Sequence, residues 1–173
     1  MKIYLIGFMG CGKSHWGKQL SKKLSLPYFD LDEEIEKEEG KTITEIFAYN
    51  GEEYFRQKEK DVLYTITENH KSFVLATGGG TPCYFNNIAY MNKNGTSVWF
   101  NCSVDCLFHR LVKEKAKRPL IRDLSDDRLR SFIIKKFGDR KIFYRQASVI
   151  INEDDISLEK IVTAIFHEQE KEE

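Results

Sequence analysis

Eight residues near the start of the chain have the types and spacing of a phosphate-binding loop. The run Gly7-Phe8-Met9-Gly10-Cys11-Gly12-Lys13-Ser14 fits G-x-x-x-x-G-K-[ST], and it lies between a strand-like and a helix-like segment. The glycines allow a sharp turn whose N–H groups surround a phosphate, and the helix that begins near Lys13 adds its dipole. In such a loop the lysine reaches the β- and γ-phosphates, and the serine hydroxyl ligates Mg²⁺. The pattern predicts nucleoside triphosphate binding; the alternative is a glycine-rich turn without a ligand.

Two carboxylates, Asp30 and Asp32, follow the second strand-like segment. Ligands of parallel α/β sheets bind beyond the carboxyl ends of the strands, which is where this pair is expected. In an extended chain, residues i and i+2 point the same way, so one carboxylate could help to hold Mg²⁺ while the other meets a substrate hydroxyl. The same residues fit a helix N-cap followed by an acidic first turn. When the pair is considered together with the phosphate loop, a role in ligand binding is favoured over a role in helix capping alone.

Three further features are compatible with a ligand site. The run Gly78-Gly79-Gly80 follows the strand-like Phe73–Ala76, and a backbone without side chains can present its N–H groups to a ligand. A bulge or hinge would use the same glycines. The basic segment Lys113–Arg122, interrupted by a proline, could fold over a nucleotide as a lid, although its composition alone favours a solvated loop. Arg56 and Arg140, each taken alone, are expected to be surface residues.

The elements that must position these residues alternate along the chain. We expect strands at Lys2–Ile6, Tyr28–Asp30, Phe73–Ala76, Ser97–Phe100 and Ser148–Ile151. We expect helices at Lys13–Leu24, Glu33–Asn69 (broken near Gly40 and Gly51), Asn86–Lys93, Val104–Lys115, Arg128–Phe137 and Leu158–Glu168. Short apolar strands that alternate with helices predict an α/β fold, with a parallel sheet covered by helices on both faces.

Length and composition exclude several classes of protein. The 173 residues are enough for a single domain, and the 27 basic and 27 acidic side chains cancel, so no basic field for nucleic acid is expected. No apolar run approaches the ~20 residues of a membrane span, and the N-terminus does not resemble a signal peptide, so a cytoplasmic protein is expected. The four cysteines form no C-x-x-C pair, which favours reduced thiols over a zinc site.

Taken together and in order, these residues resemble the shikimate kinases, which belong to the nucleoside-monophosphate-kinase-like group of P-loop kinases. The resemblance covers nearly the whole chain. The segments that carry it are GFMGCGKS at 7–14, Asp30-Leu31-Asp32, Gly-Glu-Glu-Tyr-Phe-Arg at 51–56, Ala-Thr-Gly-Gly-Gly at 76–80, Lys-Arg-Pro-Leu at 117–120, and Arg140 with Tyr144.

The resemblance implies a three-layer α-β-α fold whose five-stranded parallel sheet has the order 2-3-1-4-5. Within this single domain it implies a helical substrate-binding segment at about 33–61 and a lid at about 113–126. The implied reaction is ATP-dependent phosphorylation of the 3-hydroxyl of shikimate, a step of aromatic amino acid biosynthesis, with Mg²⁺, by a monomer that binds neither nucleic acid nor membrane.

The resemblance also implies roles for individual residues. Lys13, Asp32 and Arg118 are the expected catalytic residues. The residues expected to bind ATP are Gly10, Cys11, Gly12, Lys13, Ser14, His15, Arg110, through stacking on adenine, and Arg118. Those expected to bind shikimate are Asp32, Arg56, Gly78, Gly79, Gly80 and Arg140, and those expected to hold Mg²⁺ are Ser14 and Asp30.

The chain departs from the family pattern in three places. His15 replaces a usual threonine, Lys141-Ile142-Phe143 replaces a common Asn-Pro-Leu, and Thr81-Pro82-Cys83 follows the triple glycine. None of these residues is assigned to the chemistry. Two alternatives stay open at this point: a kinase for another small polyol or a nucleoside monophosphate, and a catalytically silent relative that binds a nucleotide or a partner.

Overall fold

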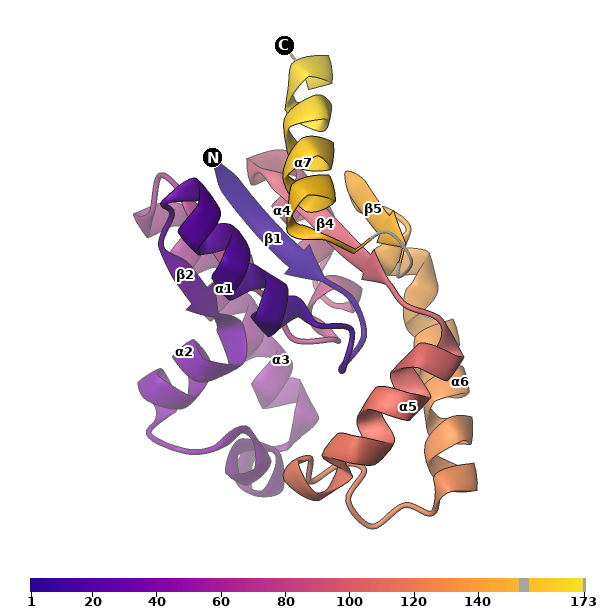
Figure 1. The fold of residues 1–173 in the computed structure, drawn as a ribbon. Coiled ribbons are helices and arrows are strands. Elements are labelled where there is room, and N and C mark those ends of the chain that lie inside the picture. The colour runs from indigo at the N-terminus through magenta and orange to yellow at the C-terminus, as the bar shows by residue number, and fades with distance from the viewer. Residues whose placement is uncertain (153–155, 173) are drawn as a thin grey trace.

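A five-stranded parallel sheet forms the centre of the molecule, with helices on both faces (Figure 1). The computed structural model of the chain describes residues 1–152 and 156–172. The strands are β1 (Lys2–Ile6), β2 (Tyr28–Asp30), β3 (Phe73–Ala76), β4 (Thr96–Asn101) and β5 (Val149–Asn152). Their order in the sheet is β2-β3-β1-β4-β5 and every neighbouring pair is parallel, which confirms the expected fold class.

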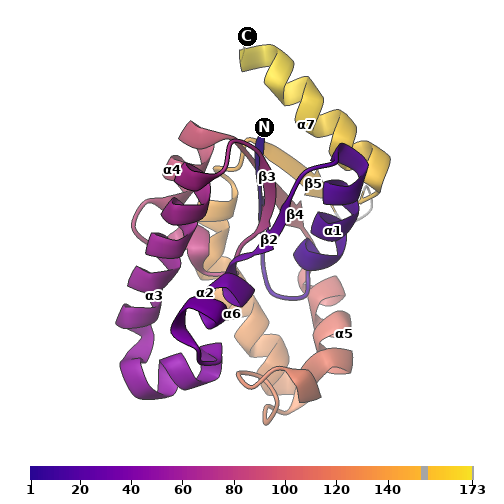
Figure 2. The same cartoon turned by 90° about the vertical axis from the view of Figure 1, so that its left-hand side faces the viewer.

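Helices connect these strands, and one more helix follows the last strand. They are α1 (Lys13–Leu24), α2 (Leu31–Glu39), α3 (Ile43–Asn69), α4 (Asn87–Asn94), α5 (Val104–Glu114), α6 (Asp126–Tyr144) and α7 (Leu158–Glu172). Two short 3₁₀ helices, Thr81–Cys83 and Lys115–Lys117, lie between them. Figure 2 shows α1 and α7 on one face of the sheet and α3 and α4 on the other. Among the described residues, no helix has the length and apolar character that a membrane crossing would need.

The apolar composition of β1 explains its place at the centre of the sheet. Its residues Ile3, Tyr4, Leu5 and Ile6 are all fully buried, so both faces of this strand are covered. A strand with apolar side chains on both faces is stable only in the middle of a sheet with helices on either side. The phosphate loop follows β1 directly and therefore begins from the most rigid part of the fold.

Local signals set the ends of the helices beside the sheet. Asp30 caps α2 by accepting a hydrogen bond from the backbone N–H of Asp32, and Thr42 and Glu45 form a capping box at the start of α3. The expected breaks are confirmed, because α2 ends at Gly40 and α3 is kinked at Gly51, where the backbone is not helical (φ 81°, ψ 175°). Helix α2 and the kinked helix α3 therefore connect the edge strand β2 with its neighbour β3.

The expectation of a helix at Arg128–Phe137 is wrong at both ends. The helix α6 begins at Asp126, after Ser125 caps it by accepting from the N–H of Arg128, and it continues to Tyr144. Its buried residues follow one stripe along the whole length: Leu129, Ile133, Phe137 and Tyr144. Because the core contact extends past Gly138, the glycine does not end the helix, and Arg140 consequently lies on a helix anchored at both ends.

The basic segment between α5 and α6 is partly anchored to the core. Ile121 is fully buried, whereas Leu120 is 69% exposed. The segment contacts the core through Ile121, and Arg118, Pro119 and Leu120 lie beside the site described below. The side chain of Lys117, which belongs to the same basic segment, lies outside the part of the chain that the structure describes.

Candidate active site

The phosphate loop turns sharply from β1 into α1. Gly7, Gly10 and Gly12 all have positive φ (138°, 81° and 101°), a conformation that side chains rarely adopt. Lys13 opens α1, and its Nζ lies 2.8 Å from the carbonyl oxygen of Gly7 and donates to it. The loop therefore curls around the lysine ammonium, with the N-terminus of α1 facing the same space.

Two loop residues expected at the nucleotide contribute differently. The side chain of Cys11 is buried, its Sγ accepts from Lys13 Nζ at 3.7 Å, and its backbone N–H donates to the carbonyl of Phe8 at 3.2 Å. The exposed ring of His15 lies edge-on to Trp16, and its Nε2 lies 2.7 Å from the side-chain amide nitrogen of Gln19, from which it accepts.

The helix-cap interpretation of Asp30 and Asp32 is confirmed. The extended pair is wrong, because Asp32 lies in the first turn of α2 and Asp30 is its N-cap, with Oδ1 3.2 Å from the N–H of Asp32. The other oxygen of Asp30 accepts from the hydroxyl of Ser14 at 2.8 Å. Capping therefore orients Asp30 so that one oxygen holds the helix and the other meets the phosphate loop.

A cavity of about 270 Å³ lies over the phosphate loop. The residues that line it are Met9, Gly10, Gly12, Lys13, Ser14, His15, Asp30, Asp32, Thr77, Gly78, Gly79, Glu114 and Arg118. We call it the phosphate cavity. It brings together the loop, both carboxylates and the lid arginine that sequence analysis had placed in separate segments.

A second cavity, of about 280 Å³, adjoins the first. Its lining consists of Met9, Asp32, Ile43, Phe47, Phe55, Arg56, Glu59, Gly78, Gly79, Gly80, Arg118, Pro119, Leu120 and Arg140. We call it the acceptor cavity. Asp32, Gly79 and Arg118 line both cavities, so a group at their junction would contact ligands on either side.

Arg56 differs from the expectation of a solvated surface residue. Its side chain is only 10% exposed, and Nη1 donates to Glu59 at 2.8 Å. The Glu59 side chain is 1% exposed, and its other oxygen accepts from the Thr81 hydroxyl at 2.5 Å. Sequence analysis missed Glu59; the available signal was its position three residues after Arg56 on one helical face. A buried arginine with a paired carboxylate is held in a fixed orientation.

Arg140 reaches the acceptor cavity from α6. Its guanidinium lies over the ring of Phe8, with Cζ 5.6 Å from the ring centroid. A Cβ atom on Gly79 would lie 3.2 Å from Arg140 Nη1, so the arginine closely approaches the glycine backbone. One turn further along α6, the hydroxyl of Tyr144 donates to the carbonyl of Gly79 at 2.5 Å. The helix therefore ties Arg140 to the triple glycine.

Asp32 is the most perturbed carboxyl group at the junction of the cavities. Removal from water, together with the nearby carboxylates Glu59 and Asp30, raises the pKa of Asp32 to about 7, although Lys13 opposes the shift. A carboxylate whose pKa lies near neutrality is suited to accept a proton from a hydroxyl group at neutral pH.

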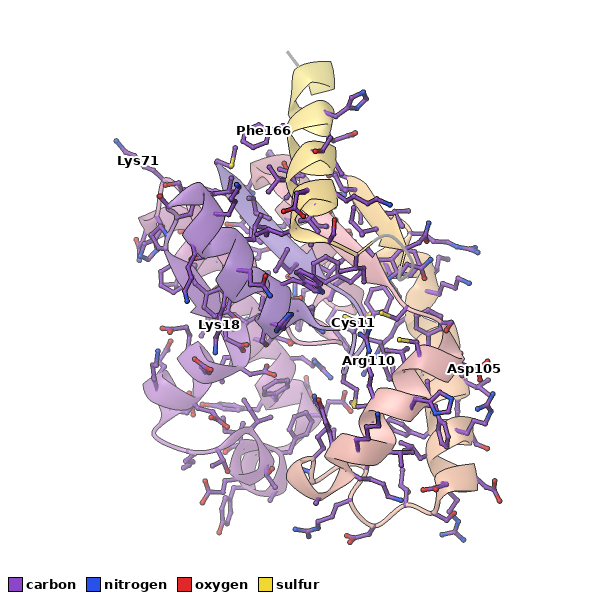
Figure 3. All side chains as sticks on the ribbon, viewed as in Figure 1. Cys11, Lys18, Lys71, Asp105, Arg110 and Phe166 are labelled. Atoms are coloured by element: carbon purple, nitrogen blue, oxygen red, sulfur yellow. The ribbon has the colours of Figure 1, made fainter. Side chains whose placement is uncertain are left out.

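Two arginines approach the phosphate loop from the opposite side. Arg118 is held by Glu114, whose Oε2 accepts from Nε and Nη2 at 3.0 and 2.6 Å. Arg110 points from α5 toward the loop near Cys11 (Figure 3), and its Nη1 donates to the carbonyl of Gly10 at 3.2 Å. Arg118 lines both cavities, whereas Arg110 is not among the residues that line either of them.

The other cavities contain none of these groups. The largest, of about 480 Å³ between β5 and α7, is lined by residues such as Val149, Ile150 and Ala164 and by none of the motif residues. Across the described ranges 1–152 and 156–172, no group of three His, Cys, Asp or Glu side chains could hold a metal ion by itself. The chemistry of the chain is therefore concentrated at the two adjoining cavities.

Comparison with known proteins agrees with this geometry. The sequence model of the shikimate kinase family matches residues 9–170. A shikimate kinase of Azobacteroides pseudotrichonymphae is 43% identical over 149 residues, which cover 86% of this chain and 88% of the relative.

Solved structures of shikimate kinases also match over almost the whole chain. The enzyme of Bacteroides thetaiotaomicron is 38% identical, with a TM-score of 0.87 and coverage of 98% of this chain and 97% of that one. The enzyme of Acinetobacter baumannii, solved in complex with shikimate, is 29% identical, with a TM-score of 0.84 and coverage of 99% and 94%. With this extent of sequence and structural match, the chain belongs to the shikimate kinase family.

Proposed function

We propose that this protein transfers the γ-phosphoryl group of ATP to the 3-hydroxyl group of shikimate. The observation that carries the proposal is the pair of adjoining cavities, one built on a phosphate loop and the other containing two arginines, which share Asp32 and Arg118. A phosphoryl group passing between two ligands must travel across such a junction. Membership of the shikimate kinase family supports the same acceptor.

The phosphate cavity binds ATP. The backbone of Gly10 and Gly12 surrounds the phosphates at the N-terminus of α1, with Cys11 between them in the loop, and Lys13 pairs with the β- and γ-phosphates. His15 lies beside the α-phosphate, where its ring takes the place of a hydroxyl side chain. Arg110 covers the nucleotide from α5.

The donor set also fits Mg²⁺. Ser14 and Asp30 present a hydroxyl and a carboxylate oxygen 2.8 Å apart in the phosphate cavity, and Mg²⁺ prefers oxygen ligands and takes few of them from the protein. These two residues would hold the ion, Asp30 through water. When bound, the ion neutralises charge on the phosphates.

The acceptor cavity binds shikimate through complementary groups. Arg56 and Arg140 pair with its carboxylate, because a guanidinium can donate two parallel hydrogen bonds to one carboxylate. The backbone of Gly78, Gly79 and Gly80 approaches the ring without an intervening side chain. An apolar wall completes the cavity and covers the carbon skeleton; it is formed by Ile43, Phe47, Phe55, Pro119 and Leu120.

The transfer step requires positioning, charge compensation and exclusion of water. Asp32 orients the 3-hydroxyl and accepts its proton as the hydroxyl oxygen bonds to the γ-phosphorus and the bond to the bridging oxygen of ADP breaks. Lys13 and Arg118 offset the negative charge that spreads over the transferred group. The segment at about 113–126, from which Arg118, Pro119 and Leu120 line the acceptor cavity, forms the lid that keeps competing water away.

A coupled assay of ADP release tests this proposal against its alternatives. Purified protein is given ATP, Mg²⁺ and one acceptor at a time from shikimate, gluconate, CMP and AMP. We expect rapid ADP release with shikimate and release near background with the others, because only shikimate combines a carboxylate with a ring that the apolar wall covers. Preferred turnover of gluconate or a nucleotide would indicate a different acceptor, and no release with any of the four would indicate a silent relative.

Replacing Arg56 with lysine tests the carboxylate anchor. Arg56→Lys keeps the positive charge but loses the planar group that donates two parallel hydrogen bonds. The KM for shikimate should therefore rise about tenfold or more, while the KM for ATP stays unchanged. Steady-state kinetics with each substrate varied in turn measures both. A matched control is Arg130→Lys, since Arg130 lies on α6 with a side chain that is 45% exposed, outside both cavities. An unchanged KM for shikimate would leave Arg140 as the only anchor.

A further inference from the structure

The guanidinium group of Arg56 is bonded on one side and open on the other. Nη1 donates to Glu59 at 2.8 Å, and Nε and Nη2 both donate to one oxygen of Glu52 at 3.3 Å. A guanidinium has five N–H donors, so these bonds with described residues leave one on each terminal nitrogen. Two terminal N–H groups side by side are what a bidentate carboxylate requires. A carboxylate can bind both open N–H groups only if the plane of the Arg56 guanidinium is turned so that they face it. The rotation of this plane therefore controls carboxylate binding.

A single short segment, residues 80–84, contacts Arg56 at two points and its partner Glu59 at a third. At Gly80, a Cβ atom would lie only 2.6 Å from Nη1 of Arg56, so the guanidinium lies directly against the backbone there. The Thr81 hydroxyl holds Glu59. The ring of Tyr84 lies 4.4 Å from Cζ of Arg56, within the range of a cation–π contact.

Tyr84 also bonds to Glu52, the carboxylate that lies farther from the Arg56 guanidinium than Glu59 does. Its hydroxyl donates to the same Glu52 oxygen that Arg56 uses, at 3.1 Å. The side chain of Glu52 is 58% exposed, and an exposed ion pair at 3.3 Å orients an arginine only loosely. The tyrosine links both members of this pair, with its ring on the arginine and its hydroxyl on the glutamate.

Tyr84 has little part in the hydrophobic core. It is 37% exposed and follows the end of the 3₁₀ helix Thr81–Cys83. Its ring contact leads to Arg56 and its hydroxyl bond leads to Glu52. The residue also does not line the acceptor cavity, so it would act on the ligand only through Arg56.

We propose that Tyr84 is a positioning residue for the acceptor carboxylate. Its ring fixes the plane of the Arg56 guanidinium and its hydroxyl fixes Glu52, so that the two open N–H groups face the acceptor cavity. This inference rests on the proposed function, because it takes the acceptor to be a carboxylic acid. It extends that function to a residue outside the cavity.

Three substitutions and a control separate the ring from the hydroxyl. Tyr84→Leu removes both contacts, Tyr84→Gln fills similar space without a ring, and Tyr84→Phe keeps the ring but loses the bond to Glu52. Tyr49→Leu is the matched control, since Tyr49 is on the same helix as Arg56 and is 78% exposed. Each variant is assayed for kcat, for KM of ATP and shikimate, and for the preference for shikimate over its carboxamide.

Loss of the ring should act on acceptor binding alone. For Tyr84→Leu and Tyr84→Gln we expect KM for shikimate to rise about three- to tenfold, the preference for the acid over the carboxamide to fall by a similar factor, and KM for ATP to stay unchanged. Tyr84→Phe should recover most of this loss, and Tyr49→Leu should match the unmodified protein. A role in folding alone would not move the acid-to-amide preference.

Opposite results would overturn the proposal. If both ring-less variants kept the original KM for shikimate and the original preference, Tyr84 would not position Arg56, while phosphorylation of shikimate by the unmodified protein would still stand. If both substrates lost affinity equally, the effect would be one of general stability. If the unmodified protein did not phosphorylate shikimate at all, the proposed function would fail, and this inference with it.

Discussion

Replacing Lys13 with alanine is expected to lower kcat about a thousandfold while the protein stays folded. Lys13 lies at the first position of α1 and lines the phosphate cavity, so its ammonium would offset charge on the transferred phosphoryl group. Alanine is at least as good a helix former, and the hydrogen bonds of Nζ to the loop carbonyls contribute only about 1 kcal/mol each to stability. Circular dichroism and steady-state kinetics on the same preparation measure both effects.

The control for this variant is Lys23→Ala, which removes an exposed lysine from the same helix. It should keep the activity of the unmodified protein. Retained turnover by Lys13→Ala would contradict the role of the phosphate loop, because no other lysine lines the phosphate cavity. Loss of the circular dichroism signal would instead assign the effect of the substitution to folding.

Replacing Asp32 with asparagine is expected to lower kcat between about a hundredfold and a thousandfold, with a smaller effect on either KM. Asparagine keeps the shape and one acceptor oxygen but cannot take up the proton of the hydroxyl. Since the pKa of Asp32 in the free protein is raised to about 7, kcat/KM for shikimate should fall as the pH drops below 7. The variant should lack this part of the pH profile.

The same substitution should change stability in the opposite direction. Burial and the neighbouring carboxylates raise the pKa of Asp32 above its value in the unfolded chain, so its ionised form destabilises the fold. The destabilisation is absent below the unfolded pKa of about 4, grows as the pH rises from about 4 to about 7, and stays constant above about 7. At pH 8, Asp32→Asn should therefore unfold at a higher temperature than the unmodified protein, and its free energy of unfolding should be larger by roughly 1 kcal/mol or more. At pH 4 the two proteins should unfold at nearly the same temperature.

Asp61→Asn is the control, because Asp61 is exposed on α3 and lines neither cavity. Thermal unfolding at the two pH values and kinetics from pH 5 to 9 complete the comparison. An unchanged kcat for Asp32→Asn would remove Asp32 from the chemistry. A stability gain equal at both pH values would show that the effect does not come from ionisation.

Much of the site could be predicted from the sequence, because local rules position its parts. The phosphate loop follows a mostly apolar strand and precedes a helix, and the carboxyl ends of parallel strands bring Asp30 and the triple glycine to the same edge. Each of these parts needs only neighbouring residues in the chain to adopt its conformation. The strand order itself came from the family resemblance rather than from the spacing of the strands.

The remaining features depend on contacts between distant segments. Arg56 follows Glu52 and Glu53 on a charged stretch that is typical of a solvated helix face, and only the segment 80–84, packed over it, makes it a buried group. The only local signal for Glu59 is its position three residues after Arg56, which does not by itself show that both side chains are buried. The length of α6 was underestimated for the same reason, since its second half is held in a helix by Tyr144 in the core and not by its own composition.

Phosphorus NMR of the reaction products tests phosphoryl transfer to shikimate most directly. The protein is incubated with ATP, Mg²⁺ and shikimate, and the phosphorus signals are correlated with those of neighbouring protons. We predict one new phosphate ester coupled to the proton on carbon 3 of shikimate, formed in equal amount to ADP and absent with Lys13→Ala. Inorganic phosphate as the only new signal, or an ester on another carbon, would contradict transfer to the 3-hydroxyl group.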